Sequence, residues 1–517
     1  MRRFTIAAGA AAVAIAGLCA ATPVAAQKTL NVAMGAADLG ALDPHRTATT
    51  QDKAIIGWMF NGLVRIRPGS ISPADIEPDI AERWESSPDQ LTWKFFLRKG
   101  VRFHGGYGEL TSDDVVFSLK RAADPKTSAF SSDFRAISDI TALDPYTVEI
   151  KFREHIPSVL GILTNYQGGY IVSRKAVEAL GDEFRSKAVG TGPFAYADYQ
   201  RNQAVTLAAH KEYFRGAPRI DRIVYRYIPS DASRDLAFTS GELDLMFGRA
   251  DQKWVERMRQ TPDTQVLIFG PGELGAVHLN ITKKPLDDVR VRQAVAHAIN
   301  RAQIVKFRGE SVFQAAVSIV PEGYLGTDEK APLQPYDVAK AKKLLAEAGY
   351  KDGITLKAIQ TSQPSMLSVM EVVQAQLKQA GINLQFEVVD HPTFHAQIRK
   401  DLSDVVYYSA ARFPIADQHL TQFYHSRSTV GTPTAVTNFS HCGMADAEID
   451  AARVATDPEK QKALWKEAQR KLIEAVCSVP LAGNTQVWAK RGKLDLGYDL
   501  KGSLSLGPLI TEASTLR

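Results

Sequence analysis

Residues 354–388, ITLKAIQTSQPSMLSVMEVVQAQLKQAGINLQFEV, contain the pattern that decides the fold class. Alternating apolar residues at 354–358 are typical of a strand. Apolar residues at helical spacing follow, and Gly381 is a residue that commonly ends a helix. A second alternating stretch at 382–388 completes a strand–helix–strand unit, which predicts a parallel strand pair with a right-handed crossover. We therefore expect the region 280–480 to form an α/β lobe.

The part of the chain before this unit contains shorter β-rich stretches, at 91–97, 147–152 and 223–228, separated by Gly and Pro. Composition is ordinary for a globular protein, with 45% hydrophobic and 23% charged residues, so it indicates neither a disordered nor a fibrous chain. There is no repeat, low-complexity linker or charge block to mark a boundary. About 490 residues remain once an N-terminal leader is removed, which is enough for at least two lobes.

The first 26 residues have the features of such a leader, an export signal. Arg2 and Arg3 precede an apolar stretch at 6–21, and small residues come before an expected cleavage near Ala26. Removing the two arginines lowers the net charge from +5 to +3. A charge this small and dispersed argues against nucleic acid or a membrane surface as a partner. We expect an exported, soluble mature chain.

Two cysteines, Cys442 and Cys477, remain after cleavage. In an oxidising compartment such a pair is a disulfide candidate, and two free buried thiols are the alternative. No His or Cys stands at zinc-ligand spacing, so we predict neither a metal site nor a cofactor.

Patterns of catalytic and nucleotide-binding sites give no support for an enzyme. Residues 270–275, GPGELG, have the glycine spacing of a dinucleotide site, but the following AVHLNI reads as a strand where that site needs a helix. We interpret the segment as a turn. Neither a G-x-S-x-G elbow nor a P-loop occurs in the chain. An exported hydrolase stays the competing class, and a visible nucleophile with an adjacent base would be its sign.

The run 97–121, LRKGVRFHGGYGELTSDDVVFSLKR, reads as a strand, a Gly-rich turn and a helix capped at Thr111 or Ser112. It resembles the signature of the periplasmic solute-binding proteins of family 5, which serve peptide, nickel and opine ABC importers. Other segments resemble motifs of the same family in the same order: LDPH at 42–45, FNGLV at 60–64, IEPDIAERW at 76–84, GTGPF at 190–194, PLDDVRVRQAVAHAINR at 285–301 and YDVAKAKKLLAEAGY at 336–350.

The resemblance implies an α/β, two-lobed, hinged periplasmic-binding-protein fold (type II, cluster C) with an additional inserted β-rich domain. The first lobe would be discontinuous. The implied division is a signal peptide at 1–26, lobe I at 27–60, 185–275 and 485–517, the inserted domain at 61–184, and lobe II at 276–484.

The function that the resemblance implies is that of the periplasmic substrate-binding component of an ABC importer. Ligand would close the lobes, and the closed, monomeric, non-catalytic protein would deliver it to an inner-membrane permease with cytoplasmic ATPase subunits. Peptides are the leading ligand class. A non-peptide anionic solute, such as an opine, a sugar acid or a nickel chelate, is the alternative.

In peptide-binding members of the family, an extended ligand pairs with the main chain of two segments. These correspond here to Ala48-Thr49-Thr50 and Ala410-Ala411-Arg412. The second segment departs from the peptide binders, because Ala411 replaces an aromatic residue and Pro414 replaces the aspartate that pairs with the peptide amino group.

The gain of Arg412 in place of an anchoring carboxylate favours an anionic ligand group, since arginine pairs with carboxylates through two parallel hydrogen bonds. Alternatively Arg412 points outward, or Asp417 takes over the aspartate's role. Phe130 and Arg135 are further cleft candidates, because their region faces the cleft in the family.

Overall fold

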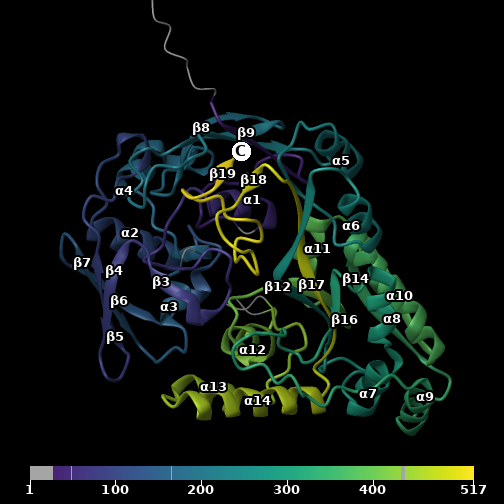
Figure 1. The fold of residues 1–517 in the computed structure, drawn as a ribbon. Coiled ribbons are helices and arrows are strands. Elements are labelled where there is room, and N and C mark those ends of the chain that lie inside the picture. Colours follow the sequence, from purple (N-terminus) through teal and green to yellow (C-terminus); the bar gives the residue numbers. More distant parts are fainter. Residues whose placement is uncertain (1–26, 48, 165, 432–436) are drawn as a thin grey trace, which may run out of the picture.

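The structure is a computed structural model that describes residues 27–517 apart from 48, 165 and 432–436. The expected signal peptide and Ala48 thus lie outside the described residues. No helix in the described part of the chain is both long and apolar enough to cross a bilayer. The strands form one large and several small sheets, with helices on both sides (Figure 1).

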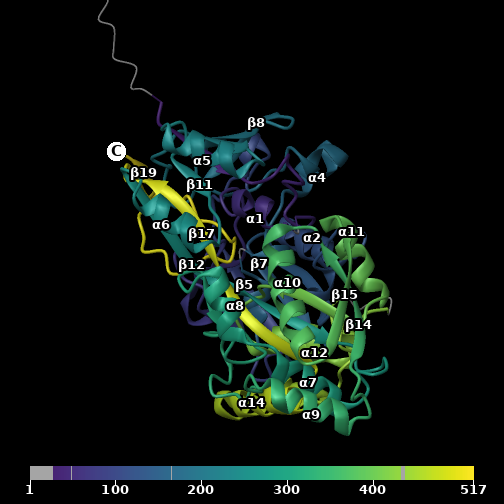
Figure 2. The same cartoon turned by 90° about the vertical axis from the view of Figure 1, so that its right-hand side faces the viewer.

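A large sheet runs through the centre of the molecule and joins segments far apart in the sequence. Its order is β16 (Val405–Ala410), β12 (Thr264–Leu279), β17 (Ser478–Arg491), β11 (Leu245–Phe247), β1 (Thr29–Met34), β10 (Arg222–Tyr227), β9 (Ala204–Ala209) and β8 (Phe194–Gln200), and β13 (Phe313–Ala315) also pairs with β17. β1 runs parallel to β10 and β11, and the other pairs are antiparallel. The expected lobe boundaries at 275 and 484 fall inside the long strands β12 and β17, which cross the molecule together (Figure 2). The domain division itself stays a prediction.

The region 61–184 contains a four-stranded antiparallel sheet on one side of the molecule (Figure 1). Its order is β4 (Ala81–Ser86), β5 (Thr92–Leu97), β7 (Thr147–Phe152) and β6 (Ile137–Asp144), and it is accompanied by the pair β2 (Val64–Ile66) and β3 (Ile76–Pro78). The helices of this region are α2 (Ser112–Ala123), α3 (Val159–Ile162) and α4 (Arg174–Leu180), with the 3₁₀ turns η1 (Pro73–Asp75), η2 (His104–Gly106), η3 (Ser131–Phe134), η4 (Gln167–Gly169) and η5 (Gly181–Arg185).

The strand–helix–strand unit predicted from the sequence is confirmed. β14 (Ile354–Thr361) pairs in parallel with β15 (Ile382–Val389), and α10 (Pro364–Gln379) makes the crossover. Gly381 follows the C-cap of α10 with φ of +88°, a conformation that favours glycine. Asp337 accepts a hydrogen bond from the Lys340 amide and so caps α9 (Val338–Glu347).

The remaining helices are α1 (Thr50–Ile56), α5 (Asp231–Thr239), α6 (Gln252–Arg259), α7 (Val289–Ala298), α8 (Arg301–Arg308), α11 (His391–Gln397), α12 (Ala416–Tyr424), α13 (Asp446–Val454) and α14 (Pro458–Glu474). The 3₁₀ turns η6 (Ile398–Lys400) and η7 (Ser426–Ser428) and the short pair β18 (Leu494–Asp495) and β19 (Thr515–Leu516) complete the described elements.

The GPGELG segment at 270–275 is not a turn, and that interpretation is wrong. It lies within β12, which continues through it with a shift in register against β17 between Phe269 and Glu273. The glycines therefore mark a strand irregularity, a common use of glycine in sheets. No helix begins after the segment, as the sequence indicated.

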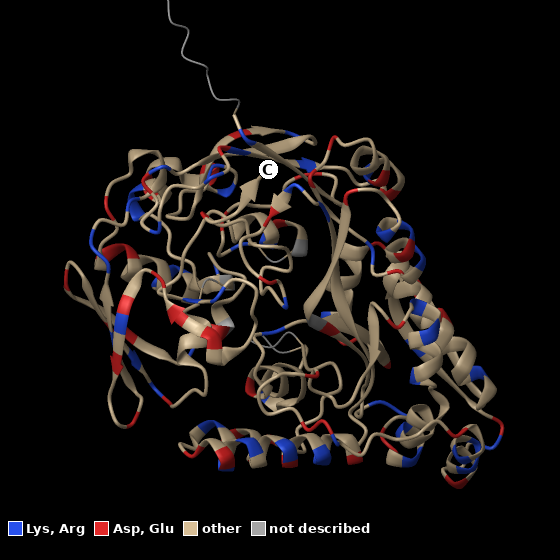
Figure 3. Ribbon diagram, in the orientation of Figure 1, with Lys and Arg blue, Asp and Glu red and all other residues tan. Residues whose placement is uncertain are grey.

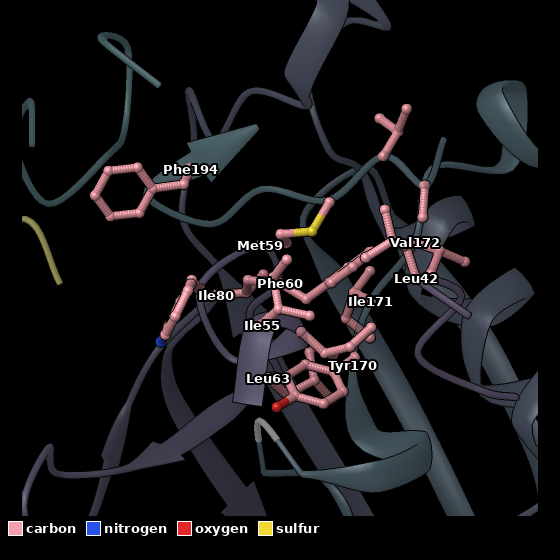
Figure 4. Close-up of a cluster of buried hydrophobic side chains, with 14 of the residues drawn as sticks. Leu42, Ile55, Met59, Phe60, Leu63, Ile80, Tyr170, Ile171, Val172 and Phe194 are labelled. Carbon is pink, nitrogen blue, oxygen red and sulfur yellow. The ribbon is translucent and has the colours of Figure 1, made fainter. Parts of the chain in front are cut away.

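The segments 42–45 and 97–121, which carry the family resemblance, serve the fold. Val115 and Leu119 on α2 are buried, and the carboxylate of Asp114 accepts a hydrogen bond from the Thr111 amide at 3.1 Å at the start of that helix. From the other end of α2, Arg121 pairs with the buried carboxylate of Asp43. The apolar side chains around this region form a continuous core, part of which is drawn in Figure 4: Leu42, Ile55, Met59, Phe60, Leu63, Ile80, Tyr170, Ile171, Val172 and Phe194.

The Asp43–Arg121 pair leads to a prediction about stability. The side chain of Asp43 is 3% exposed and that of Arg121 10%, so removing Arg121 leaves the buried carboxylate with only the half-exposed Arg46 as a cationic partner, at 3.7 Å. We expect Arg121→Met to lower the free energy of unfolding by about 3–5 kcal/mol in guanidinium titrations. Asp43→Asn combined with Arg121→Met should lower it less than Arg121→Met alone; an equal or larger loss would contradict the role of the unpaired charge.

Cys442 and Cys477 form a disulfide, with their Cα atoms 5.9 Å apart. Both lie in a buried core with residues of α12, α13 and α14, including Leu420, Ile449 and Trp465. The bond ties the segment before α13 to the start of β17.

Candidate functional site

A cavity of about 380 Å³ lies between two walls of the molecule, and we treat it as the candidate site. One wall comes from α1 and the region 61–184, and the other from α12, α13 and the segments beside them. The residues that line it are Lys53, Ala129, Phe130, Asp133, Arg135, Ala136, Glu154, Ile156, Pro157, Ser158, Ile162, Arg399, Tyr408, Arg412, Asp417, Gln418, Thr421, Gln422, Arg427, Ser428, Thr437 and Arg453.

One face of helix α12 supplies the centre of the second wall. Asp417, Gln418, Thr421 and Gln422 line the cavity, and this spacing places them on one side of a helix. The opposite face is anchored by buried apolar side chains such as Leu420 and Phe423. The polar side chains of α12 are therefore held toward the cavity by a rigid core.

Four of the residues predicted from the sequence line this cavity: Phe130, Arg135, Arg412 and Asp417. The segment at 410–412 contributes less than expected, because Arg412 lines the cavity while Ala410 is buried at the end of β16 and Ala411 is not among the lining residues.

The segment at 48–50 precedes, in the sequence, the residue of α1 that lines the cavity. Thr49 is the N-cap of α1, and its hydroxyl is hydrogen-bonded to the carboxylate of Asp52 at 3.0 Å, so it serves the helix. Ala48 is outside the described residues, and Thr50 is the first residue of α1. One turn further along, Lys53 reaches the cavity.

The lining of the cavity has an excess of positive charge. Six of the described lining residues are Lys or Arg, and three are Asp or Glu. Lys, Arg, Asp and Glu are mixed along the rest of the ribbon (Figure 3). Such a lining favours an anionic occupant.

Two of the cavity arginines already have acidic partners. Arg453 lies 3.3 Å from the carboxylate of Asp417 and also bonds the hydroxyl of Thr421 at 2.9 Å. Arg427 pairs with Asp450 at 2.9 Å. The charges of these two arginines are thus largely balanced by the protein itself, and so is that of Asp417.

Lys53, Arg399 and Arg412 have no carboxylate within ion-pair distance among the described residues. Glu273 and Asp133 nevertheless lie near enough to influence the charge of Lys53. The ammonium of Lys53 lies 5.9 Å from the centre of the Phe130 ring and 5.6 Å from that of Tyr166, so aromatic faces provide its nearest stabilisation. These cations can take the charge of a ligand.

Burial and the nearby charge of Arg412 lower the pKa of Lys53 to about 8, and Glu273 and Asp133 oppose this effect. Burial raises the pKa of Glu273, and the nearby positive charge of Lys53 partly opposes this rise. At neutral pH, Lys53 therefore carries its proton but holds it less firmly than an exposed lysine.

The main chain of Arg412 is occupied. Its N–H donates to the hydroxyl oxygen of Tyr324 at 3.1 Å, and its carbonyl accepts from the same hydroxyl at 2.9 Å. The resemblance assigned these backbone groups to an extended peptide. In this structure they bond to the protein's own side chain.

The two walls touch each other around the cavity. Nδ1 of His155 is hydrogen-bonded to the carbonyl of Arg453, and Nε2 of Gln422 donates to the carboxylate of Asp133 at 3.1 Å. Gly161 packs so closely on the ring of Phe413 that a Cβ at this position would lie 2.6 Å from a ring carbon. The structure thus shows the walls closed on the cavity.

The described residues of the cavity do not form a metal-binding site. Within the described ranges, no three His, Cys, Asp or Glu side chains lie close enough together to hold a metal ion. His391 and His395, four residues apart on α11, are hydrogen-bonded to each other through Nε2 atoms 3.1 Å apart.

Sequence reasoning missed Lys53, Asp133, Arg399, Gln422 and Arg453. Lys53 lies one helical turn after the predicted segment 48–50. Extending that prediction by one turn of the helix would therefore have included it. The others come from η3, η6, α12 and α13, and only the packing of distant elements brings them to one cavity.

The chain is similar to several known proteins. The family model described as bacterial extracellular solute-binding proteins, family 5 Middle, matches residues 75–431. The solved structure of MoaA from A. tumefaciens R10 in complex with mannopinic acid is 48% identical, covers 95% of this chain and 100% of its own, and superposes with a TM-score of 0.88.

Two further relatives are more distant. Di/tripeptide-binding protein 2 of Pseudomonas aeruginosa is 29% identical over 91% of this chain and 92% of its own length. The ABC transporter-associated periplasmic binding protein DppA from Helicobacter pylori, in complex with the peptide STSA, is 26% identical, covers 94% of this chain and 98% of its own, and has a TM-score of 0.83. The chain therefore belongs to family 5 of the bacterial extracellular solute-binding proteins, and it is the substrate-binding component of an ABC importer.

Proposed function

We propose that this protein captures a small carboxylate-bearing solute of the opine type and delivers it to its permease. The observation that carries the proposal is the group of three cavity cations, Lys53, Arg399 and Arg412, that the described carboxylates leave without an ion pair. The three cations are half-buried in the cavity lining, where an anionic ligand can supply a charge partner that the protein does not place within ion-pair distance.

The similar protein MoaA supports this ligand class. It is 48% identical to this chain and is solved with mannopinic acid, which as an acid carries a carboxylate at neutral pH. The occupied main chain of Arg412 also favours a ligand held by side chains over one held by strand pairing.

A di- or tripeptide is the second candidate. Asp417 is 6% exposed, lines the cavity, and has a buried Oδ1 without a hydrogen-bond partner among the described residues. This oxygen is a suitable acceptor for an ammonium group. Two of the similar proteins are named for or solved with peptides.

Isothermal titration calorimetry of the mature protein with mannopinic acid and with a di-alanine/tri-alanine mixture separates the two ligand classes. We expect mannopinic acid to bind at least about 100-fold more tightly, since the unpaired cations are then neutralised. Tighter binding of the peptides would replace the opine-type ligand by a peptide.

The remaining parts of the proposal concern the setting of the protein. We propose that the leader is cleaved near Ala26, that the mature protein works as a monomer in the periplasm, and that it carries out no catalysis. The ligand bridges both walls, so its higher affinity for the closed form, which the free protein also populates, increases the closed population that engages the permease.

Lys53 predicts how binding depends on pH. Its pKa of about 8 in the ligand-free protein means that it loses its proton as the pH rises through 8, and an anion then has to recapture that proton. The affinity for mannopinic acid should be constant below pH 7 and fall by up to about tenfold per pH unit above pH 8. Calorimetry from pH 6.5 to 9.5 tests this, and Lys53→Met should bind more weakly and lose the dependence. Equal wild-type affinity at pH 7 and 9.5 would rule out a role for the Lys53 charge.

A further inference from the structure

Three side chains form a hydrogen-bonded row between the two walls. Nε of Arg412 donates to Oε1 of Gln422, and Nε2 of Gln422 donates to Oδ1 of Asp133 at 3.1 Å. All three residues line the cavity. Asp133 lies in η3 on the first wall, whereas Gln422 and Arg412 belong to the second, so the row connects the walls.

Glutamine is well suited to this place. The guanidinium of Arg412 can only donate hydrogen bonds, and the carboxylate of Asp133 in its ionised form can only accept them. A side-chain amide has an acceptor at one end and a donor at the other, so it joins the two groups in one orientation. Glutamate cannot donate to Asp133 and lysine cannot accept from Arg412.

The row holds one side of the guanidinium and leaves the other available. Nη1 of Arg412 donates to the carbonyl of Ala411 at 2.9 Å, and the group lies 5.0 Å from the centre of the Phe423 ring. No described residue accepts a hydrogen bond from Nη2. Gln422 thus fixes the Nε side while Nη2 remains for a ligand, which is the arrangement that a preoriented anchor requires.

We propose that Gln422 is a positioning residue that aligns Arg412 for the anionic ligand, and that its bond to Asp133 makes this alignment depend on closure of the walls. The inference rests on the proposed function, in which Arg412 is the anchor. When the walls part, Gln422 loses Asp133, and the amide is free to turn away from Arg412. Ligand and closure therefore support each other.

A double-mutant cycle tests the alignment. Calorimetry with mannopinic acid as the probe compares the wild type, Gln422→Leu, Arg412→Met and the double variant. Gln422→Leu should weaken binding about tenfold in the wild-type background, the effect of losing a hydrogen bond to a charged group. In the Arg412→Met background the same substitution should cause a clearly smaller loss, because only the contact between Gln422 and Asp133 is then removed.

The control is Gln461→Leu on α14, where the amide donates to the carbonyl of Ala452 at 2.9 Å and does not line the cavity. It should bind the probe like the wild type. An equal loss from Gln422→Leu in both backgrounds, or no loss in either, would overturn the positioning role.

A second measurement needs no ligand. Hydrogen exchange of the free protein should be faster at 131–134 and 411–413 in Gln422→Leu than in the wild type or Gln461→Leu, because the row no longer ties these segments together. Unchanged exchange would overturn the link between the walls. If the wild type fails to bind mannopinic acid, the proposed ligand is wrong, and hydrogen exchange still decides whether the row joins the walls.

Discussion

We expect Arg412→Met to lower the affinity for the anionic solute by about 2–5 kcal/mol, a loss of at least about 30-fold. The reason is that Arg412 has no carboxylate partner of its own among the described residues, while its Nη2 is available and its main chain is held by Tyr324. Calorimetric titration of the variant with mannopinic acid measures the loss directly.

Two further variants sharpen this experiment. Arg412→Lys keeps the charge but loses the planar fork, so we expect it to recover part of the affinity and remain about tenfold weaker than the wild type. Arg201→Met removes an arginine whose side chain is 85% exposed and should leave the affinity unchanged. Wild-type affinity in Arg412→Met would contradict an anchoring role.

The second large effect concerns the disulfide. Cys442 and Cys477 are 35 residues apart, and cross-linking a loop of this length stabilises a protein by about 3–4 kcal/mol through the entropy of the unfolded chain. We therefore expect the double change Cys442→Ala and Cys477→Ala to lower the free energy of unfolding of the α12–α14 core by this amount. Tryptophan fluorescence, to which Trp465 in the same buried core contributes, follows the transition in guanidinium.

Chemical reduction supplies the control for this prediction. The wild type treated with a thiol reductant should unfold at the same guanidinium concentration as the double variant, because both lack the cross-link and keep the remaining core. If the oxidised wild type and the double variant unfold together, the bond contributes nothing to stability.

The sequence was sufficient for the elements whose pattern is local. The unit β14–α10–β15 follows from alternating and helical apolar spacing within one short stretch. The segment 270–275 shows the limit of this reasoning. Its glycines fit a turn equally well, and only the pairing of β12 with β17 makes the segment part of a strand.

Only part of the candidate site was predicted, because most of its residues come together through contacts between distant segments. Arg412 was found because it stands where the family resemblance leads one to expect other residues. Gln422 and Arg453 carry no local signal, since their roles depend on Asp133 and Asp417, which lie far from them in the sequence. The disulfide candidate needed only the count of cysteines.

The sequence and the structure give different information about the class of ligand. Peptides were the leading class from the resemblance, and relatives named for peptides remain among the similar proteins. The departures at Ala411, Arg412 and Pro414 indicated an anionic solute. The unpaired cations of the cavity add a physical reason for that second class.

The most direct test of an anionic solute as the ligand is native mass spectrometry of the mature protein, purified without denaturation, with identification of the compound released on unfolding. We predict one carboxylate-bearing compound bound at a 1:1 ratio to the wild type and absent from Arg412→Met. A ladder of neutral or cationic short peptides, retained equally by Arg412→Met, would contradict this prediction.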